Sequence, residues 1–478
     1  MAIMSIMLLE IMPELDVLII GGGFSGTMVA THLLRRREGL SVGVLERVSE
    51  PGRGLAYSSP HRFHLLNVPA GKMSALPDDS EHFLRWARSN YDASVQPRSF
   101  LPRSLYGNYV GSLLERAIAD GDQHHFQWIQ DEALSLQLRD GHLAVQRKNG
   151  SEISARAVVL AIGNFPPADP RVSGLKPEST LYFPFAWAPN VLEDLPSDGS
   201  ILLIGSGLTS VDLVMALRSK RFKGTVHVLS RKGLLPRRYR PAEPWPPFWD
   251  ERSPRTTRGL LRLIREQIAL ASERDATWRA VIDSLRPATQ EIWQALPYDE
   301  KRRFLRHLRS HWEVHRHRIA PEIGDVLADM KAEGLVHTYA GRILRYSEHR
   351  GIAKISYRER FSRRKRTLKA NRVVNCTGSE TDCRRIDDSL ISSLFAQGLA
   401  RPDPLFLGLD ADEHGGLVDY NGTPSSSLFA VGPTRKGSLW ETTAVPEIRE
   451  QAAELAEHIG RTLASQSREY RDAIGTAV

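Results

Sequence analysis

Apolar and polar positions alternate along the chain in a pattern that predicts strands and helices in turn. Asp16 to Ile20 is a short apolar run of the buried-strand type, and Ser41 to Leu45 is a second one. Between them a helical stretch ends near the basic residues 35–37, which suit the negative end of a helix dipole. Its apolar positions are Met28, Val29, Leu33 and Leu34. This order of elements predicts a βαβ unit of a parallel sheet.

The same unit recurs later in the chain. Ile201 to Ile204 is apolar, a helical stretch runs through Leu217, and Thr225 to Leu229 reads as the next strand. The remaining pattern predicts part-helical residues 76–118, strands in 126–162, a loop at 241–255, helices in 256–333, strands in 335–375, a buried strand at 428–432 and a last helix over 445–466.

Composition places the chain among ordinary globular proteins. It has 478 residues, of which 41% are hydrophobic and 25% charged, and no apolar run is long enough to span a membrane. The net charge of +8 permits attraction to anionic ligands without demanding nucleic acid. The two cysteines, Cys376 and Cys383, cannot form a disulfide framework, so a reducing, cytoplasmic setting is the default.

The first twelve residues hold four of the eight methionines. They lack a basic n-region and are interrupted by Glu10, which argues against a signal peptide. We expect Met12 to be the true start and residues 1–11 to be a frayed extension.

A glycine-rich turn separates the first strand from its helix. It contains Gly21, Gly22, Gly23, Phe24, Ser25 and Gly26. The first glycine makes the tight turn, the third lets the backbone approach a pyrophosphate closely, and the last lets helix and strand pack. Glu46 ends the second strand, where a carboxylate would accept the ribose hydroxyls. A purely structural glycine turn would not require this acid, so we predict dinucleotide binding.

The second turn has a similar form but a different charge. It contains Gly205, Ser206, Gly207, Leu208, Thr209 and Ser210, so a small serine replaces the last glycine. After the next strand stand Ser230, Arg231 and Lys232 in place of an acid. Cations there attract the 2′-phosphate of NADPH, although a solvated loop would have the same composition. Two nucleotide turns on one chain predict electron transfer between NADPH and FAD, with FAD at the acidic site.

The architecture resembles the two-dinucleotide-binding-domain flavoproteins. The segments LAIGNFPP (160–167) and VNCTG (374–378) resemble their crossovers between domains, and LFAVG (428–432) resembles the strand that brings the last helix onto the flavin. PGRGLAYSS (51–59), HLLNVPAGKMSALPDD (64–79), FLPRSLYGNYV (100–110) and GSLWETTAVPEIREQ (437–451) resemble a bacterial subfamily that includes flavin-dependent amino-acid N-monooxygenases and urate hydroxylases. No CxxxxC follows the first turn, which argues against a disulfide reductase.

The resemblance implies an α/β fold with two Rossmann-like domains. We expect residues 12–165 and 370–478 to form a split FAD domain, and 166–369 to form an inserted NADPH domain with a helical insert at 256–333. Further cofactor contacts follow from matching positions, with packing or surface roles as alternatives. They are Arg53, Asn67, Met73, Arg103, Gly163, Gly378, Gly432, Trp440, Glu441 and Thr442. No catalytic side chain is assigned.

Residues 301–318 form a basic stretch with seven Lys or Arg, four His and one acid, Glu313. His307, His311 and His315 have the spacing of one helix face. Without an accompanying carboxylate or cysteine, we expect a solvated or anion-facing helix and no metal site.

We therefore predict an FAD-dependent, NADPH-using monooxygenase that forms a C4a-hydroperoxyflavin and hydroxylates a small polar substrate, either an amino-acid amine or a heterocycle. The expected partners are that substrate and molecular oxygen, with no membrane partner, while nucleic acid is disfavoured. Two alternatives stay open: an NADPH-dependent flavin reductase without oxygen insertion, and a flavin-bearing sensor that holds an anionic partner on its basic helix. The sequence leaves the substrate, its site of hydroxylation and the oligomeric state open.

Overall fold

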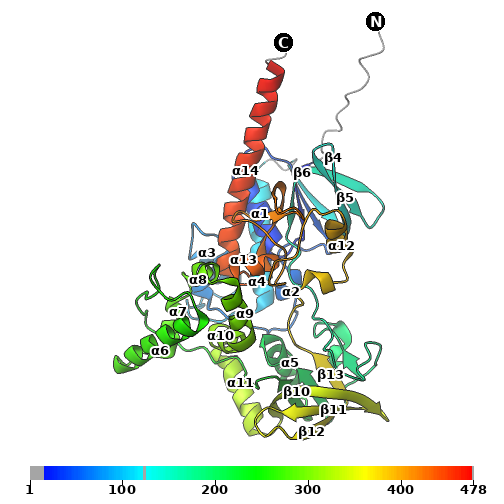
Figure 1. Ribbon diagram of the computed structural model, residues 1–478, viewed down its shortest axis with the longest axis vertical. Coiled ribbons are helices and arrows are strands. Elements are labelled where there is room, and N and C mark those ends of the chain that lie inside the picture. Colours follow the sequence, from blue (N-terminus) through cyan, green and yellow to red (C-terminus); the bar gives the residue numbers. More distant parts are fainter. Residues whose placement is uncertain (1–14, 122–124, 476–478) are drawn as a thin grey trace. The chain divides into compact units, whose positions relative to one another are not determined.

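The computed structural model describes residues 15–121 and 125–475 (Figure 1). The expectations for residues 1–11 and for Met12 as the start lie outside these residues. The chain divides into two compact units. Of the described residues, the first contains those up to Pro60, those in Pro69–Asn164 and those from Thr381 onward, and the second contains His61–Val68 and Phe165–Glu380.

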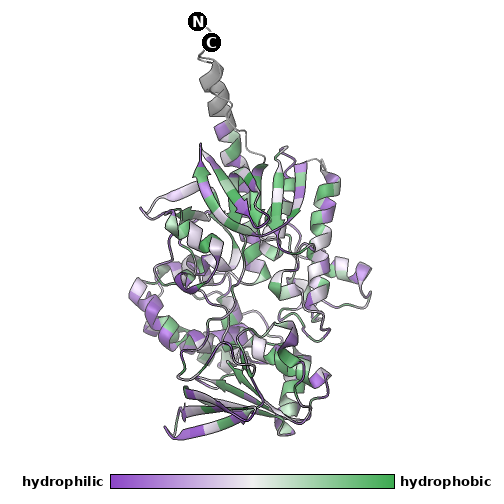
Figure 2. Ribbon diagram, turned by 90° about the vertical axis from the view of Figure 1, so that its right-hand side faces the viewer, coloured by the Kyte–Doolittle hydropathy of each residue, from purple (hydrophilic) through white to green (hydrophobic). Residues whose placement is uncertain are grey.

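The first unit is built on an eight-stranded sheet whose central strands run parallel (Figure 2). Strand β1 (Leu15–Ile20) lies between β2 (Val42–Glu46) and β6 (Glu152–Leu160), and each of its residues from Val17 to Ile20 pairs with both neighbours. The strands outside this centre are β3 (Phe126–Gln130), β4 (Ala133–Arg139), β5 (His142–Arg147), β14 (Gly416–Val418) and β15 (Pro424–Ala430). Strand β1 is buried on both faces, which explains its unbroken apolar run.

Helices cover this sheet. Helix α1 (Phe24–Arg35) packs against both α4 (Arg103–Asp120) and α14 (Val445–Gly475), and all but its last residue are buried. The remaining helical segments are α2 (Gly54–Tyr57), η1 (Ala70–Lys72), α3 (His82–Asn90), η4 (Cys383–Arg385), α12 (Ser389–Ala396), η5 (Gly432–Arg435) and α13 (Lys436–Leu439). The close packing of α1 fixes the turn that precedes it.

The second unit has a seven-stranded sheet in the order β12-β11-β10-β9-β8-β13-β7. Its parallel part consists of β7 (Tyr182–Phe183), β8 (Ser200–Ile204), β9 (Thr225–Ser230), β13 (Arg372–Asn375) and the first part of β10 (Val336–His349). Beyond Ala340, β10 pairs antiparallel with β11 (Ile352–Glu359), which pairs antiparallel with β12 (Lys365–Ala370). We call β10, β11 and β12 the meander.

Two apolar layers hold this unit together. Helix α5 (Leu208–Ser219) and helix α11 (Pro321–Ala332) cover one face of the parallel strands, with Val214 and Met330 in the layer between. The inner face of the meander covers the opposite face, where Ile355 and Tyr357 join Leu202. The other helical segments are η3 (Pro189–Leu192), α6 (Thr257–Glu273), α7 (Trp278–Ser284), α8 (Thr289–Ala295), α9 (Tyr298–His307) and α10 (Arg309–Arg316).

The structure differs from the predicted domain boundaries in two places. The chain returns to the first unit at Thr381 instead of residue 370, because β13 pairs with β8 and β7 of the second unit. In addition, His61–Val68 belongs to the second unit. Buried His64 lies there with its Nε2 3.1 Å from the Asp212 carbonyl oxygen and its ring edge-on to Trp187.

The predicted single helix face for His307, His311 and His315 is also wrong. The helical stretch is interrupted at Leu308, between α9 and α10, so His307 lies on a different helix from His311 and His315. Within the described part of the chain, no helix combines the length and the apolarity needed to cross a membrane.

Candidate functional site: two glycine turns and their surroundings

The first glycine turn connects β1 to α1. At two of its glycines, Gly21 and Gly26, the backbone packs so closely that a Cβ would overlap a carbonyl oxygen. Gly21 has a φ of +106°, and a Cβ on it would overlap the Ala161 carbonyl oxygen. A Cβ on Gly26 would overlap the carbonyl oxygen of Gly21 itself. At Gly23, by contrast, an added Cβ would meet only Gly54, at 3.4 Å. The turn is therefore closed on its packing side, and Gly23 keeps the backbone open at the start of α1.

Glu46 lies directly beside this turn. Its carboxylate accepts hydrogen bonds from the backbone N–H of Gly22 and of Arg47, both at 2.7 Å. Each carboxylate oxygen retains acceptor capacity for a ribose hydroxyl. The sequence did not point to Trp128, whose ring would be struck by a Cβ on Gly22 and whose indole N–H is buried without a partner. The ring adds an apolar wall beside Gly22.

Arg53 lies beside the same turn, because its neighbour Gly54 adjoins Gly23. Its guanidinium pairs with Glu50 at 2.8 Å and donates to the Ser104 carbonyl oxygen at 3.3 Å. Arg103 is the first residue of α4 and interacts with other groups of the protein. Phe24 packs on Tyr57 and Tyr106, with ring centroids 6.3 and 5.9 Å apart, which anchors the start of α1.

The end of β15 meets the first turn from the other side. Gly432 has a φ of +79°, and a Cβ there would lie 2.5 Å from the Ser25 hydroxyl oxygen. The fully buried Thr442 donates from its hydroxyl to the Gly432 carbonyl oxygen at 2.9 Å. Trp440 and Glu441 are buried in the same segment, just before α14. The structure thus brings the predicted residues Gly432 and Thr442 to the start of α1.

Two more predicted residues lie in the first unit. Met73 is buried directly after η1, and Arg449 of α14 donates to the carbonyl oxygen of its neighbour Ser74 at 3.1 Å. Gly163 has a φ of +68° with open space where a Cβ would lie. Asn67, predicted to accompany Met73, belongs to the second unit instead.

The second glycine turn connects β8 to α5. Gly205 has a φ of +113°, and a Cβ on it would overlap the Cys376 carbonyl oxygen, whereas a Cβ on Gly207 would meet nothing within 4 Å. Buried Ser210 donates from its hydroxyl to the Gly207 carbonyl oxygen at 2.7 Å. A serine therefore fits where the first turn requires glycine. Thr209 is half-buried in the first turn of α5, and Gly378, with a φ of +90°, also has open space around it.

A small polar network ties this turn to the end of β9. The Ser206 hydroxyl oxygen lies 2.8 Å from the Ser230 hydroxyl and 2.5 Å from the Leu234 carbonyl oxygen. Ser230 also accepts a hydrogen bond from the Gly233 N–H at 2.9 Å. This network holds the loop with Arg231 and Lys232 in place.

Four cationic or titratable groups gather at this loop. Lys232 donates to the His307 carbonyl oxygen at 2.7 Å, and its pKa is lowered by burial and by the charges of Arg360 and Arg231. His311 is close enough that Lys232 and Arg360, after burial itself, lower its pKa as well. Arg231 is exposed. Positive charges that lower the pKa of Lys232 and of His311 would also attract an anion to this loop.

Arg360 was not among the predicted site residues. It follows β11, and its backbone N–H donates to the Ala340 carbonyl oxygen at 2.8 Å. A Cβ on Gly233 would lie 2.9 Å from the Ala340 Cβ, so the turn after β11 adjoins the loop after β9. The run of basic residues from Arg358 to Arg366 was visible in the sequence, but only the sheet order shows where it lies.

Cys376 is not an activated nucleophile. Its thiol is buried, and burial together with the charge of Asp212 raises its pKa. A thiol held in the protonated form does not attack substrates, so Cys376 has no nucleophilic role. Its buried Asn375 donates to the Ala168 carbonyl oxygen at 3.1 Å.

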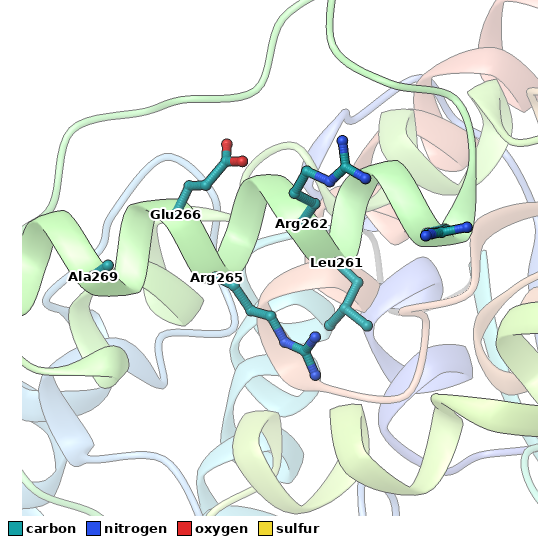
Figure 3. A pocket seen from close by; sticks show the side chains of 6 residues that line it. Leu261, Arg262, Arg265, Glu266 and Ala269 are labelled. Atoms are coloured by element: carbon teal, nitrogen blue, oxygen red, sulfur yellow. The ribbon is translucent and has the colours of Figure 1, made fainter.

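Two cations of the basic stretch 301–318 are buried and do not face solvent. Arg318 is buried, pairs with Asp283 and lies over the ring of Tyr239. Arg316 is buried as well. A separate hollow of about 460 Å³ runs along α6 (Figure 3). It is lined by Arg258, Leu261, Arg262, Arg265, Glu266 and Ala269, and none of the predicted site residues lies in it.

Comparison with known proteins agrees with this architecture. Residues 18–165 match a family model described as FAD-NAD(P)-binding. No curated protein matches the sequence. A cadaverine monooxygenase of desferrioxamine biosynthesis from Erwinia amylovora, solved with FAD, is similar at a TM-score of 0.66 and 15% identity, over 94% of this chain and 95% of that one.

Two further solved structures are similar to this chain. An L-lysine 6-monooxygenase from Pseudomonas syringae has a TM-score of 0.65 and 17% identity, over 94% of this chain and 99% of that one. An ornithine N-hydroxylase from Kutzneria sp. 744, solved with reduced FAD, NADP⁺ and L-ornithine, has a TM-score of 0.62 and 14% identity over the same shares. The fold is that of the two-domain FAD/NAD(P) flavoproteins, which confirms the predicted class of two Rossmann-like domains, one inserted in the other.

Proposed function

We propose that the chain is an FAD-dependent, NADPH-using monooxygenase that hydroxylates the amine nitrogen of a small polar substrate. The observation that carries the proposal is the pair of glycine turns with opposite charge beside them. Glu46 hydrogen-bonds the first turn, and Lys232 with Arg360 flanks the second. Amine substrates are favoured because three solved proteins of the same fold are named for cadaverine, lysine or ornithine.

In this proposal the first unit holds FAD and the second holds NADPH. The backbone at Gly23 and the start of α1 would face the FAD pyrophosphate, with Glu46 on the adenosine ribose and Arg53 near the phosphates. Open space at Gly207 offers the same approach for NADPH, and Lys232, Arg231 and Arg360 would surround its 2′-phosphate. The remaining predicted contacts, Asn67, Met73, Arg103, Gly163 and Gly378, stay part of the proposal.

Bound FAD supplies the redox chemistry, since its reduced form reacts with oxygen. The overall reaction consumes an amine, O₂, NADPH and a proton, and yields a hydroxylamine, NADP⁺ and water. The chain contributes binding, orientation and shielding from water. The start of α14, with Trp440 to Thr442 before it, would stabilise negative charge on the reduced ring, because a helix N-terminus favours anions. No side-chain base is required for the oxygen transfer.

A substrate screen of the purified protein tests this function. NADPH consumption and product mass are followed together with lysine, ornithine, cadaverine, aspartate and urate. We expect one amine to accelerate NADPH consumption and to gain one oxygen atom, with little hydrogen peroxide released. NADPH consumption that yields only hydrogen peroxide with every amine would contradict oxygen insertion. Hydroxylation of urate alone would move the substrate to the heterocycles.

A further inference from the structure

One short segment of the protein carries a net charge as large as that of the whole chain. Between Arg342 and Lys369 the sequence has eleven Lys or Arg and two acids, Glu348 and Glu359, a net charge of +9. The whole chain carries only +8, so the rest of it has a net charge of −1. This segment forms the greater part of the meander.

Strand register arranges these cations in rows on one face. Arg342 pairs with Arg358, which pairs on its other side with Lys365, and residues directly opposite one another point to the same face. The next row contains Arg345, and the third contains Lys354 and Lys369. Five of these six cations are exposed and Lys354 is half-buried.

Both acids of the segment have the opposite orientation. Glu348 pairs with buried Ala353, and Glu359 pairs with buried Gly341, so neither lies on the face of the six cations. That face points away from the core, because the inner face of the meander packs on the parallel strands. Like charges directly opposite one another destabilise a sheet, so this arrangement is kept at a cost.

The first row adjoins the cations of the second nucleotide turn. Arg360 follows Arg358 by two residues and acts on Lys232. The cations near Lys232 therefore adjoin the first row, and the rows follow one another across the meander roughly 7 Å apart. This is more cationic surface than one phosphate group can contact.

We propose that this outer face of the meander steers NADPH, a polyanion, into its site. The inference rests on the proposed function, because it presupposes that NADPH binds at the second turn. Charges that line the approach to a site raise the association rate by roughly 10–10³-fold and act less as salt increases. Cations on the rim affect the association rate and its salt dependence, whereas contact residues affect dissociation. NADPH gains more than NADH because its 2′-phosphate adds about −1.5 to −2 charge.

The test removes the two rows farthest from the turn. The triple variant Arg345→Gln, Lys354→Gln, Lys369→Gln leaves Lys232 and Arg360 in place. Calorimetry with NADP⁺ on the oxidised holoprotein is expected to show roughly tenfold weaker binding at about 10 mM ionic strength, where the Debye length is about 30 Å. The difference in affinity should fall below about twofold at about 1 M salt, where the Debye length is about 3 Å. In stopped-flow experiments, the observed rate of flavin reduction should rise less steeply with NADPH concentration, while its limiting value at high NADPH should be unchanged.

A matched control removes three charges elsewhere in the same unit. Arg258, Arg262 and Arg265 lie on α6 and are exposed (Figure 3), so changing them to Gln alters the net charge equally. Their loss should leave NADP⁺ binding within about twofold at each salt concentration. Equal weakening of NADP⁺ binding by both variants, or no weakening by the meander variant, would overturn the steering proposal. The proposed function would be unaffected by either result. Wild-type holoprotein that binds no NADP⁺ would contradict the proposed function and this inference together.

Discussion

Changing Gly26 to alanine is expected to give a folded protein that retains little or no flavin. The new Cβ would overlap the Gly21 carbonyl oxygen and lie 3.1 Å from the Ala161 Cβ, and neither α1 nor β1 can give way in a fully buried layer. Overpacking of this kind costs about 1–3 kcal/mol. If that cost falls on the conformation that receives the pyrophosphate, FAD affinity drops roughly 10–100-fold. Flavin released per protein after denaturation, and a titration with added FAD, measure the loss.

Gly111 provides the control for this change. It also lies in a helix of the first unit, but an added Cβ would be 3.5 Å from its nearest neighbour, an ordinary contact. Gly111→Ala should purify with as much flavin as the wild type. Full flavin occupancy in Gly26→Ala would show that the first turn does not hold the cofactor.

The double variant Lys232→Ala, Arg360→Ala is expected to abolish the preference for NADPH over NADH. Hydrogen bonds to charged groups contribute about 1.5–3 kcal/mol each, so losing two cations should lower kcat/KM for NADPH about 100-fold or more. The value for NADH, which lacks the 2′-phosphate, should change by less than about threefold. Steady-state kinetics with both nucleotides give the ratio.

Two charges on α6 serve as the reference for that ratio. Arg258→Ala with Arg262→Ala removes the same charge from exposed positions of the same unit and should leave the preference intact. An unchanged preference in the Lys232 and Arg360 double variant would mean that the 2′-phosphate binds elsewhere.

Local signals predicted the two glycine turns well. The strand, turn, helix and acid around Glu46 are close in sequence, and each residue type has one plain physical task there. The structure adds the reason for the final glycine in one turn and serine in the other. Gly26 has no room beside Gly21, whereas Ser210 can donate to the Gly207 carbonyl oxygen at 2.7 Å.

Features that depend on distant pairing were not predictable. The boundary near residue 370 was placed too early because nothing local shows that β13 pairs with β8 and β7. For the same reason Arg360 was missed, although its basic neighbours were evident, and Trp128 gave no signal of its position over Gly22. The interruption at Leu308 could not be predicted, because the residues around it have ordinary helix propensity and include no proline or glycine.

The central claim is that one polypeptide passes electrons from NADPH to tightly bound FAD. Anaerobic mixing of the purified protein with NADPH tests it most directly, with the flavin absorbance followed in a stopped-flow spectrometer. We predict a yellow protein whose absorbance bleaches rapidly with NADPH and much more slowly with NADH. A colourless protein that cannot be reconstituted with FAD, or bound flavin that stays oxidised in the presence of NADPH, would contradict the claim.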